Sequence, residues 1–313
     1  MLPSLGLIAL ALLLTPLLLG AWLAFTRAYA LVHPPRSEII QTPEALGITN
    51  YQSVNFTSAD GLKLSAWYMP TQNGAAVILV HGHGGERSYL LPEAAMLAQR
   101  GYGILLIDLR NSGQSESAPT TFGVNEVNDV RGAIEFLRRQ PGVDADRLGL
   151  LGHSMGAGTA LLSAARLPQI KAVIAESGFT SLEDNVANGM KRYVKLPPFL
   201  ADALIFFGER AAGIKISAVR PIDEIARISP RPVMIVHGAL DDLMPVANAY
   251  ALYAAAHAPK ELYLIPNAGH NSLPPAEPEE YARRITGFFD KYLLLRQETD
   301  AQWAGARAGT SPL

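Results

Sequence analysis

The pentapeptide Gly-His-Ser-Met-Gly at residues 152–156 has the residue types of a turn that carries a nucleophilic serine. It follows the apolar run Leu148 to Leu151 and precedes a stretch rich in alanine and glycine, so we expect a strand, a tight turn and a helix. Such a turn strains the backbone of the serine, and the glycines two residues away on each side let neighbouring backbone approach closely. The pattern predicts Ser154 as a nucleophile.

A serine hydroxyl is a poor nucleophile at neutral pH, so Ser154 needs a base within hydrogen-bond reach and a carboxylate that orients this base. His270 follows the last expected strand, in a loop at the same edge of the sheet as Ser154. The acid is expected after the preceding strand, where Asp241 and Asp242 are adjacent, and Glu176 at the end of another strand is a third candidate. Spacing alone does not choose among these carboxylates.

A glycine-rich loop, His-Gly-His-Gly-Gly at residues 81–85, follows the apolar run Ala76 to Val80. We expect the backbone amides of His83 and Met155 to stabilise the negative oxygen of the transition state. The loop lacks the Lys-Ser/Thr ending of a phosphate-binding loop, and its two histidines have no third metal ligand nearby. The sequence therefore predicts neither a metal site nor a cofactor.

The composition excludes several classes of chemistry. The chain has 313 residues and no cysteine, which excludes disulfides, thiolate zinc sites and a thiol nucleophile. Lysine and arginine number 26 against 28 for aspartate and glutamate, so no overall positive charge favours nucleic acid as a partner. With 49% hydrophobic residues the chain can bury a large core. Its oligomeric state is not predicted.

The N-terminus carries a long apolar segment. No residue from Leu2 to Phe25 is charged, and at about 1.5 Å per residue the stretch spans roughly 36 Å, enough to cross a bilayer. We expect an uncleaved single-pass anchor at residues 1–30, with a signal peptide cleaved after Ala30 or a buried soluble helix as alternatives. Arg27 and Arg36 follow the span and favour a cytoplasmic catalytic domain, with a periplasmic or secreted domain as the alternative.

After a proline-containing linker at 31–50, we expect a catalytic domain at 51–296. It opens with a hairpin around Asp60 and Gly61, between two runs of alternating polarity. Short apolar runs then alternate with stretches of helical length, which predicts an α/β fold with a mostly parallel sheet between helices. The expected strands lie at 76–80, 103–107, 147–151, 172–175, 232–236 and 262–265, and the expected helices at 87–100, 124–140, 155–167, 246–256 and 278–295.

The interval of more than fifty residues between Glu176 and Pro232 is too long for a single crossover helix, which predicts a helical cap at about 178–230. We expect its aromatic residues Phe179, Phe206 and Phe207 to line a substrate pocket, although they could equally form the cap's own core. Residues 297–313 have the small, polar composition of a flexible tail.

These motifs together resemble the α/β-hydrolase superfamily, in the branch of depalmitoylase-like and prolyl-oligopeptidase-like serine hydrolases, membrane-anchored and bacterial. The pattern His-Gly-x-x-Asp-x-x-x-Pro at 237–245 implies that Asp241 is the acid, with Asp242 at a variable position. Glu176 starts the segment that resembles the beginning of the cap, where the acidic residue is not usually part of the triad. Asp108 and Arg110 belong to the loop motif Asp-x-Arg-x-x-Gly-x-Ser, and we interpret them as a pair that ties loops together.

We therefore expect a serine hydrolase in which Ser154, His270 and Asp241 form a triad that cleaves a small-molecule acyl ester or thioester through an acyl-enzyme. The same residues would serve a peptidase of the prolyl-oligopeptidase-like type, or an acyltransferase that uses an alcohol in place of water. The alternative from another class is a non-catalytic, membrane-tethered binding module on a hydrolase scaffold.

Overall fold

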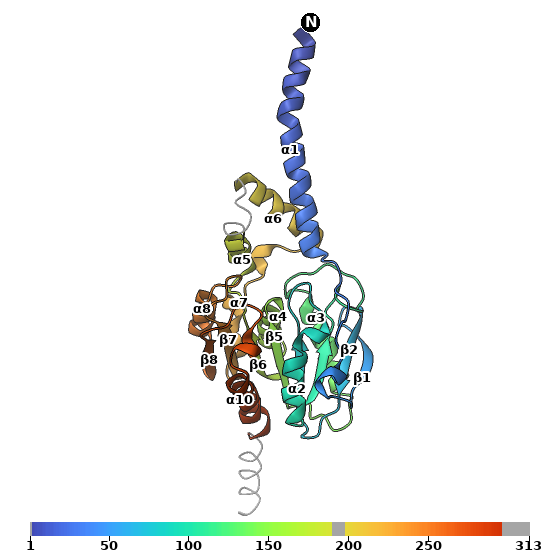
Figure 1. Cartoon of the computed structure of the whole chain (residues 1–313), viewed down its shortest axis with the longest axis vertical. Helices are drawn as coiled ribbons and strands as arrows, with labels where there is room; N and C mark the ends of the chain where they lie inside the picture. The colour runs from blue at the N-terminus through green and yellow to red at the C-terminus, as the bar shows by residue number, and fades with distance from the viewer. Residues whose placement is uncertain (1, 190–197, 296–313) are drawn as a thin grey trace, which may run out of the picture.

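A computed structural model of the chain describes residues 2–189 and 198–295, so the expected tail at 297–313 lies outside the described residues. The centre of the molecule is an eight-stranded sheet with the order β1-β2-β4-β3-β5-β6-β7-β8 (Figure 1). Its strands are β1 (Gln52–Thr57), β2 (Lys63–Met69), β3 (Ala76–Val80), β4 (Gly103–Ile107), β5 (Leu148–His153), β6 (Ile170–Glu176), β7 (Val233–Gly238) and β8 (Lys260–Ile265).

The opening strands β1 and β2 are antiparallel, and β2 is antiparallel to β4, whereas all pairs from β4 to β8 are parallel. This confirms the predicted α/β class with its mostly parallel sheet. In β3, β4 and β5 every residue is buried, which explains why these strands are continuous apolar runs. The register pairs Val80 with Gly152, so the loops that follow β3 and β5 start side by side.

Helices cover both faces of the sheet. Alternate residues of β4 belong to two separate hydrophobic clusters, with Leu105 and Ile107 in one and Ile104 and Leu106 in the other. The first cluster includes residues of α3 (Glu126–Leu137), α4 (Met155–Arg166) and α8 (Ala247–Ala255). The second includes residues of α2 (Leu91–Gln99), α10 (Pro278–Phe289) and η6 (Asp290–Leu294). Short helical turns lie at η1 (Pro43–Leu46), η2 (Arg87–Leu90) and α9 (Leu273–Ala276).

The region of the expected cap, between β6 and β7, contains α5 (Leu182–Gly189), α6 (Pro198–Ala212), η4 (Ile216–Ala218), α7 (Pro221–Glu224) and η5 (Ile225–Ile228). Of these, α7 and η5 lie against α4, whereas α6 lies along the N-terminal helix α1 (Leu2–Val32) (Figure 1). The rings of Phe25 on α1 and Phe207 on α6 meet edge to face, with centroids 5.6 Å apart. One part of the cap segment therefore packs on the domain, and another part packs on α1.

Helix α1 projects from one end of the domain (Figure 1). Its stretch Gly6–Val32 contains an 18-residue window with a mean hydropathy of 2.3 and is long and apolar enough to cross a membrane or to be a signal sequence. Most of it is exposed, but Ala24, Ala28 and Val32 near its end are buried. The amide of Thr120 donates to the carbonyl of Val32 at 2.9 Å, so the end of α1 is bound to the domain.

Candidate active site

Ser154 lies at the sharp turn between β5 and α4, with a φ of 57° that few residues other than glycine adopt. The glycines around it allow this turn. A Cβ atom on Gly152 would lie 2.0 Å from the carbonyl oxygen of Gly156, and one on Gly156 would lie 2.1 Å from that of Val80. Both contacts are with backbone, which has little room to move, so the turn requires glycine at both positions.

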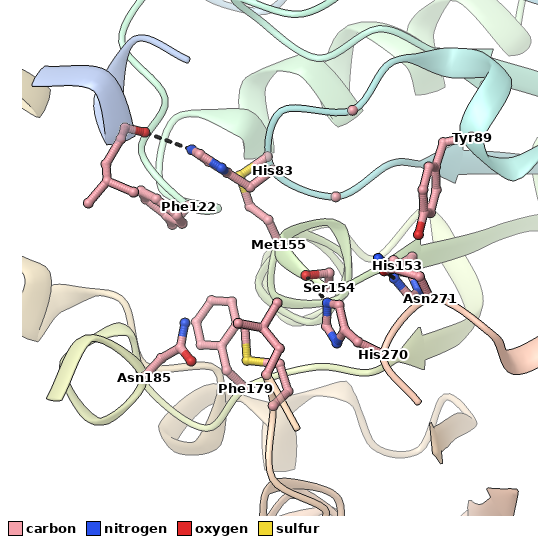
Figure 2. A pocket seen from close by; sticks show the side chains of 15 residues that line it. His83, Tyr89, Phe122, His153, Ser154, Met155, Phe179, Asn185, His270 and Asn271 are labelled. Atoms are coloured by element: carbon pink, nitrogen blue, oxygen red, sulfur yellow. Dashed lines mark hydrogen bonds between the residues drawn. The ribbon is translucent and has the colours of Figure 1, made fainter. Parts of the chain in front are cut away.

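The structure brings Ser154, His270 and Asp241 together from three loops. The Nε2 atom of His270 lies 2.9 Å from the hydroxyl of Ser154 (Figure 2), and its Nδ1 atom lies 2.8 Å from Oδ2 of Asp241. All three side chains are buried. Of the competing acids, Asp241 rather than Asp242 makes this contact, and Glu176 instead accepts a hydrogen bond from the hydroxyl of Tyr281.

Asp241 is held as a carboxylate. The amides of Leu243 and Met244 donate to its Oδ1 atom at 3.0 and 2.7 Å. Burial alone would raise the pKa of Asp241, but the hydrogen bonds from His270 and from the Met244 amide outweigh it, and the pKa lies below its ordinary value. A carboxylate at this place accepts a hydrogen bond from the Nδ1–H group of His270, which leaves Nε2 unprotonated and able to accept a hydrogen bond from the Ser154 hydroxyl.

The loop after β3 lies beside Ser154. His81 fixes this loop, because its Nδ1 atom donates to the carbonyl of Gly82 at 2.7 Å and its Nε2 atom accepts from the amide of Leu109 at 3.2 Å. Burial lowers the pKa of His81, which keeps the ring neutral as this pattern requires. His83 of this loop lines the same pocket as Met155, the first residue of α4, whose amide has no partner within the helix.

The side chain of His83 connects this loop to α1. Its Nε2 atom lies 2.7 Å from the carbonyl oxygen of Leu31 (Figure 2), and its ring stacks on Phe122 with centroids 5.2 Å apart. Burial lowers the pKa of His83, and the neutral ring donates its Nε2 proton to Leu31. In addition, the Ser37 hydroxyl donates to the carbonyl of Gly84. The end of α1 and the segment after it therefore hold the loop that carries the His83 amide.

These residues surround a pocket of about 330 Å³ that is lined by both polar and apolar residues. Phe179 lines it, as expected from the sequence. Phe206 and Phe207 do not belong to the lining: Phe206 is 59% exposed on α6, and Phe207 packs against Phe25. This corrects the expectation for both, and the physical reason is that α6 packs on α1 instead of folding over Ser154.

The lining also contains residues that the sequence analysis did not single out: Leu31, Tyr89, Phe122, His153, Asn185, Leu243, Met244 and Asn271. His153 precedes the nucleophile position and could have been found from the motif. Burial, followed by the charge of His270, lowers the pKa of His153 to about 4, so it is uncharged at neutral pH. Leu31 had no distinguishing signal, because it is one of many apolar residues near the end of the N-terminal segment.

Asp108 and Arg110 lie outside the pocket lining and bind different partners. Asp108 accepts from the amides of Arg87 and Gln114, both at 2.8 Å, and pairs with the Arg87 guanidinium at 3.2 Å. Arg110 pairs with the buried Asp129 at 2.7 Å. Each ties loops together, as expected, but the two do not act as a pair with one another.

Comparison with known proteins agrees with this fold. A family model described as the prolyl oligopeptidase family matches residues 87–296, more than half of the chain. The chain belongs to the prolyl oligopeptidase family. Among relatives of this family member, the uncharacterized protein YfhR of Salmonella typhi is 33% identical over 236 residues, which cover 70% of this chain and 74% of YfhR. Thiohydrolase aneE of Aspergillus aculeatus is 26% identical over 277 residues, covering 71% and 87%.

Among solved structures, the Pyrococcus furiosus esterase Pf2001 is similar to this family member, with a TM-score of 0.70 and 28% identity over 84% of this chain and 98% of the esterase. The fold is thus that of the α/β hydrolases, as the sequence motifs predicted. The protein is an enzyme of the hydrolase class, esterase-like in its structural neighbours.

Proposed function

We propose that this member of the prolyl oligopeptidase family is a membrane-anchored serine hydrolase that cleaves carboxylic esters or thioesters of small acyl substrates. The observation that carries the proposal is the position of His270, which hydrogen-bonds the Ser154 hydroxyl through one ring nitrogen and the Asp241 carboxylate through the other. This arrangement makes a serine hydroxyl nucleophilic at neutral pH.

The reaction follows from these contacts. Ser154 Oγ attacks the substrate carbonyl carbon while its proton passes to Nε2 of His270, and Asp241 stabilises the imidazolium that forms. The amides of His83 and Met155 donate to the resulting oxyanion. Collapse of the tetrahedral intermediate breaks the ester or thioester bond, and the leaving alcohol or thiol takes the proton from His270. Water then attacks the acyl-serine by the same route and releases the carboxylic acid.

The lining of the pocket supports an acyl substrate. Leu31, Phe122, Phe179 and Leu243 give it apolar walls, and no lysine, arginine, aspartate or glutamate belongs to the described lining. A peptidase that binds a charged peptide terminus needs such a group. The names of the esterase and the thiohydrolase described above support the same bond types. We therefore favour ester or thioester hydrolysis over peptide hydrolysis, which the family description keeps as the alternative.

The anchor is the second part of the proposal. Cleavage after Ala30 would remove Ala24 and Ala28, which are buried against the rest of the chain, so we propose that α1 is retained as a membrane span. Arg27 and Arg36 after the span support a cytoplasmic position for the catalytic domain.

The test is turnover by the full chain in detergent of a butanoyl ester, a butanoyl thioester and a peptide amide. We expect ester and thioester hydrolysis to fall by at least about 10⁴-fold in Ser154→Ala, as is usual when a triad serine is removed. Ser53→Ala, at an exposed serine of β1, is the matched control and should leave turnover unchanged. Wild-type turnover in Ser154→Ala would refute the proposal, and faster cleavage of the amide than of the ester would favour a peptidase.

A further inference from the structure

A second apolar depression adjoins the active-site pocket. It is a narrow groove of about 60 Å³ between α1, α5 and α6, lined among others by Ala28, Leu204, Ile205 and Gly208. Leu31 and Phe122 line both this groove and the pocket that contains Ser154, so the two are adjacent and share these two side chains as a common wall. Within the described part of the chain, only these two apolar side chains therefore lie between the pocket of Ser154 and the space between the two helices.

Among the residues that the structure describes, the groove has one charged lining residue, Glu209. Its carboxylate accepts from Lys215 Nζ at 2.5 Å and from the amide of Ile216 at 3.1 Å, so it already has partners. The other described side chains of the lining are apolar, and Ala28 is almost completely buried between the helices. A hydrocarbon chain is the chemistry that such a surface accepts, because it removes no polar group from a partner.

The position of α6 relates the groove to the bilayer. Helix α6 runs along α1 in the same direction, from Gly20, which lies beside Leu200, to Ala28, which lies beside Gly208. Most of this part of α1 belongs to its uncharged stretch, and Phe206 on α6 is exposed beside it. Leu31, where groove and pocket meet, is itself 42% exposed. The α1 residues that line the groove, Ala28, Leu31 and Val32, directly follow Arg27, so if α1 spans a membrane the groove lies at the membrane interface, next to the acyl chains.

We propose that the groove between α1 and α6 holds the distal part of the acyl chain of a bilayer-derived ester or thioester whose carbonyl lies at Ser154. The inference rests on the proposed function and names its substrate class as long-chain acyl lipids that enter from the membrane side. The first carbons of the chain occupy the pocket of about 330 Å³, and longer chains pass Leu31 and Phe122 into the groove. In this arrangement α1 is part of the substrate site as well as an anchor.

Gly208→Leu tests the groove. A Cβ atom at Gly208 would lie 3.9 Å from that of Ala28, so there is room for the backbone to accept a side chain, but a leucine would occupy the space of the acyl chain. Arg210→Leu is the matched control, because Arg210 is exposed on the same helix and outside the lining. The full chain is reconstituted in phosphatidylcholine vesicles, and kcat/KM is measured for dodecanoyl and butanoyl thioesters.

We expect the dodecanoyl-to-butanoyl ratio of kcat/KM to fall about tenfold in Gly208→Leu, since excluding about two methylenes from apolar surface has that effect. In Arg210→Leu the ratio should equal that of the wild type. Because the readout is a ratio within one preparation, a loss of folded protein does not change it. If Gly208→Leu does not fold, Ala212→Leu, one turn further along the groove, should give the same shift.

The outcomes separate the two proposals. An unchanged ratio in the groove variants, with butanoyl turnover present, overturns the acyl-chain groove and leaves the proposed hydrolase intact. An equal shift in Arg210→Leu also overturns it, because the effect would then belong to the helix as a whole. Absence of turnover of both thioesters and of the butanoyl ester by the wild type overturns the proposed function itself.

Discussion

At the scale of residues, Asp241 differs from the adjacent Asp242 in its contact with His270. It holds the Nδ1 atom of His270 and receives two backbone amides, so it fixes both the tautomer and the orientation of the ring. Asp241→Asn replaces the carboxylate with an amide whose NH₂ group can donate a hydrogen bond to Nδ1 of His270. The ring proton then lies on Nε2, and a protonated Nε2 cannot accept a hydrogen bond from Ser154.

We therefore expect Asp241→Asn to lower kcat for a butanoyl ester by about 10⁴-fold with KM almost unchanged, as this substitution does in serine triads generally. Asp242→Asn is the matched control and should change kcat by less than about threefold, because the contact with His270 belongs to Asp241. Steady-state kinetics of both variants check this. Equal losses in the two variants would contradict the assignment of the acid.

Close to the site, Glu93, Glu176 and Tyr281 form a buried cluster. The hydroxyl of Tyr281 lies 2.5 Å from an oxygen of Glu176 and 3.0 Å from one of Glu93. A hydroxyl has a single proton to donate, so both carboxyls cannot be satisfied as carboxylates. Burial raises the pKa of Glu93 to about 7, and burial followed by the charge of Glu93 raises that of Glu176 well above its ordinary value.

This cluster makes stability depend on pH. From the ordinary pKa of 4.5 up to about 7, folded Glu93 keeps a proton that the unfolded chain releases, so the free energy of unfolding falls as pH rises through this window. Glu93→Gln should reduce the loss of stability between pH 5 and pH 8 by about 2 kcal/mol.

Urea unfolding at the two pH values measures this effect. Glu135→Gln, at an exposed glutamate of α3, is the control and should keep the wild-type dependence. The same pH dependence in Glu93→Gln as in the wild type would show that the carboxyl is not held protonated.

Much of the site could be predicted from sequence because its residues stand at fixed positions in local motifs. Ser154, His270 and Asp241 each follow a strand of the parallel sheet, and the ends of such strands meet at one edge. Phe206 and Phe207 could not be placed, since their position depends on which surface α6 covers. The sequence of an apolar helix indicates that the helix is buried or lies in lipid, but it does not indicate which partner covers the helix.

At the scale of elements, the sheet was predictable for a related reason. Strands buried on both faces are continuous apolar runs, and the hairpin around Gly61 has the turn residues that specify it. The role of α1 was not predictable. Its exposed residues satisfy the pattern of a membrane span, and the few buried ones, such as Ala28 and Val32, do not differ from their neighbours in the sequence.

Two truncations test the role of the end of α1. A chain that starts at Ala21 keeps the buried residues Ala24, Ala28 and Val32 and the Leu31 carbonyl that accepts from His83, whereas a chain that starts at Pro34 loses all of these. We expect the first to keep the turnover of a butanoyl ester within about threefold. The second should lose tenfold or more, because small displacements of a catalytic loop are costly.

The thermal unfolding temperature of both truncated chains is measured in the same detergent, in addition to their turnover of the butanoyl ester. The chain from Pro34 should unfold at a lower temperature, since it exposes apolar surface that Ala24, Ala28 and Val32 cover. Equal activity and equal stability of the two chains would mean that α1 is only a tether.

At the scale of the whole molecule, α1 projects from one end of the domain (Figure 1). Leu31 near the end of this helix lines the pocket, so the pocket lies at the same end. Under the proposed anchoring by α1, the site faces the membrane. The side of the membrane on which the domain lies can be tested simply. The chain has no cysteine, so a single introduced cysteine is the unique site for a thiol reagent.

Ser53→Cys places this thiol on β1 at an exposed position. In spheroplasts of a bacterial host that expresses the full chain, we expect a membrane-impermeant maleimide to label it only after detergent is added, because Arg27 and Arg36 after the proposed span favour a cytoplasmic domain. Labelling of intact spheroplasts would place the domain on the outer side.

The central claim is that Ser154 is an activated nucleophile, and the most direct measurement is the intact mass of the full chain after treatment with a fluorophosphonate in detergent. The account predicts one covalent adduct on the wild type and none on Ser154→Ala, with labelling reduced in Asp241→Asn. A folded wild-type chain that forms no adduct, or an adduct that persists in Ser154→Ala, would contradict it.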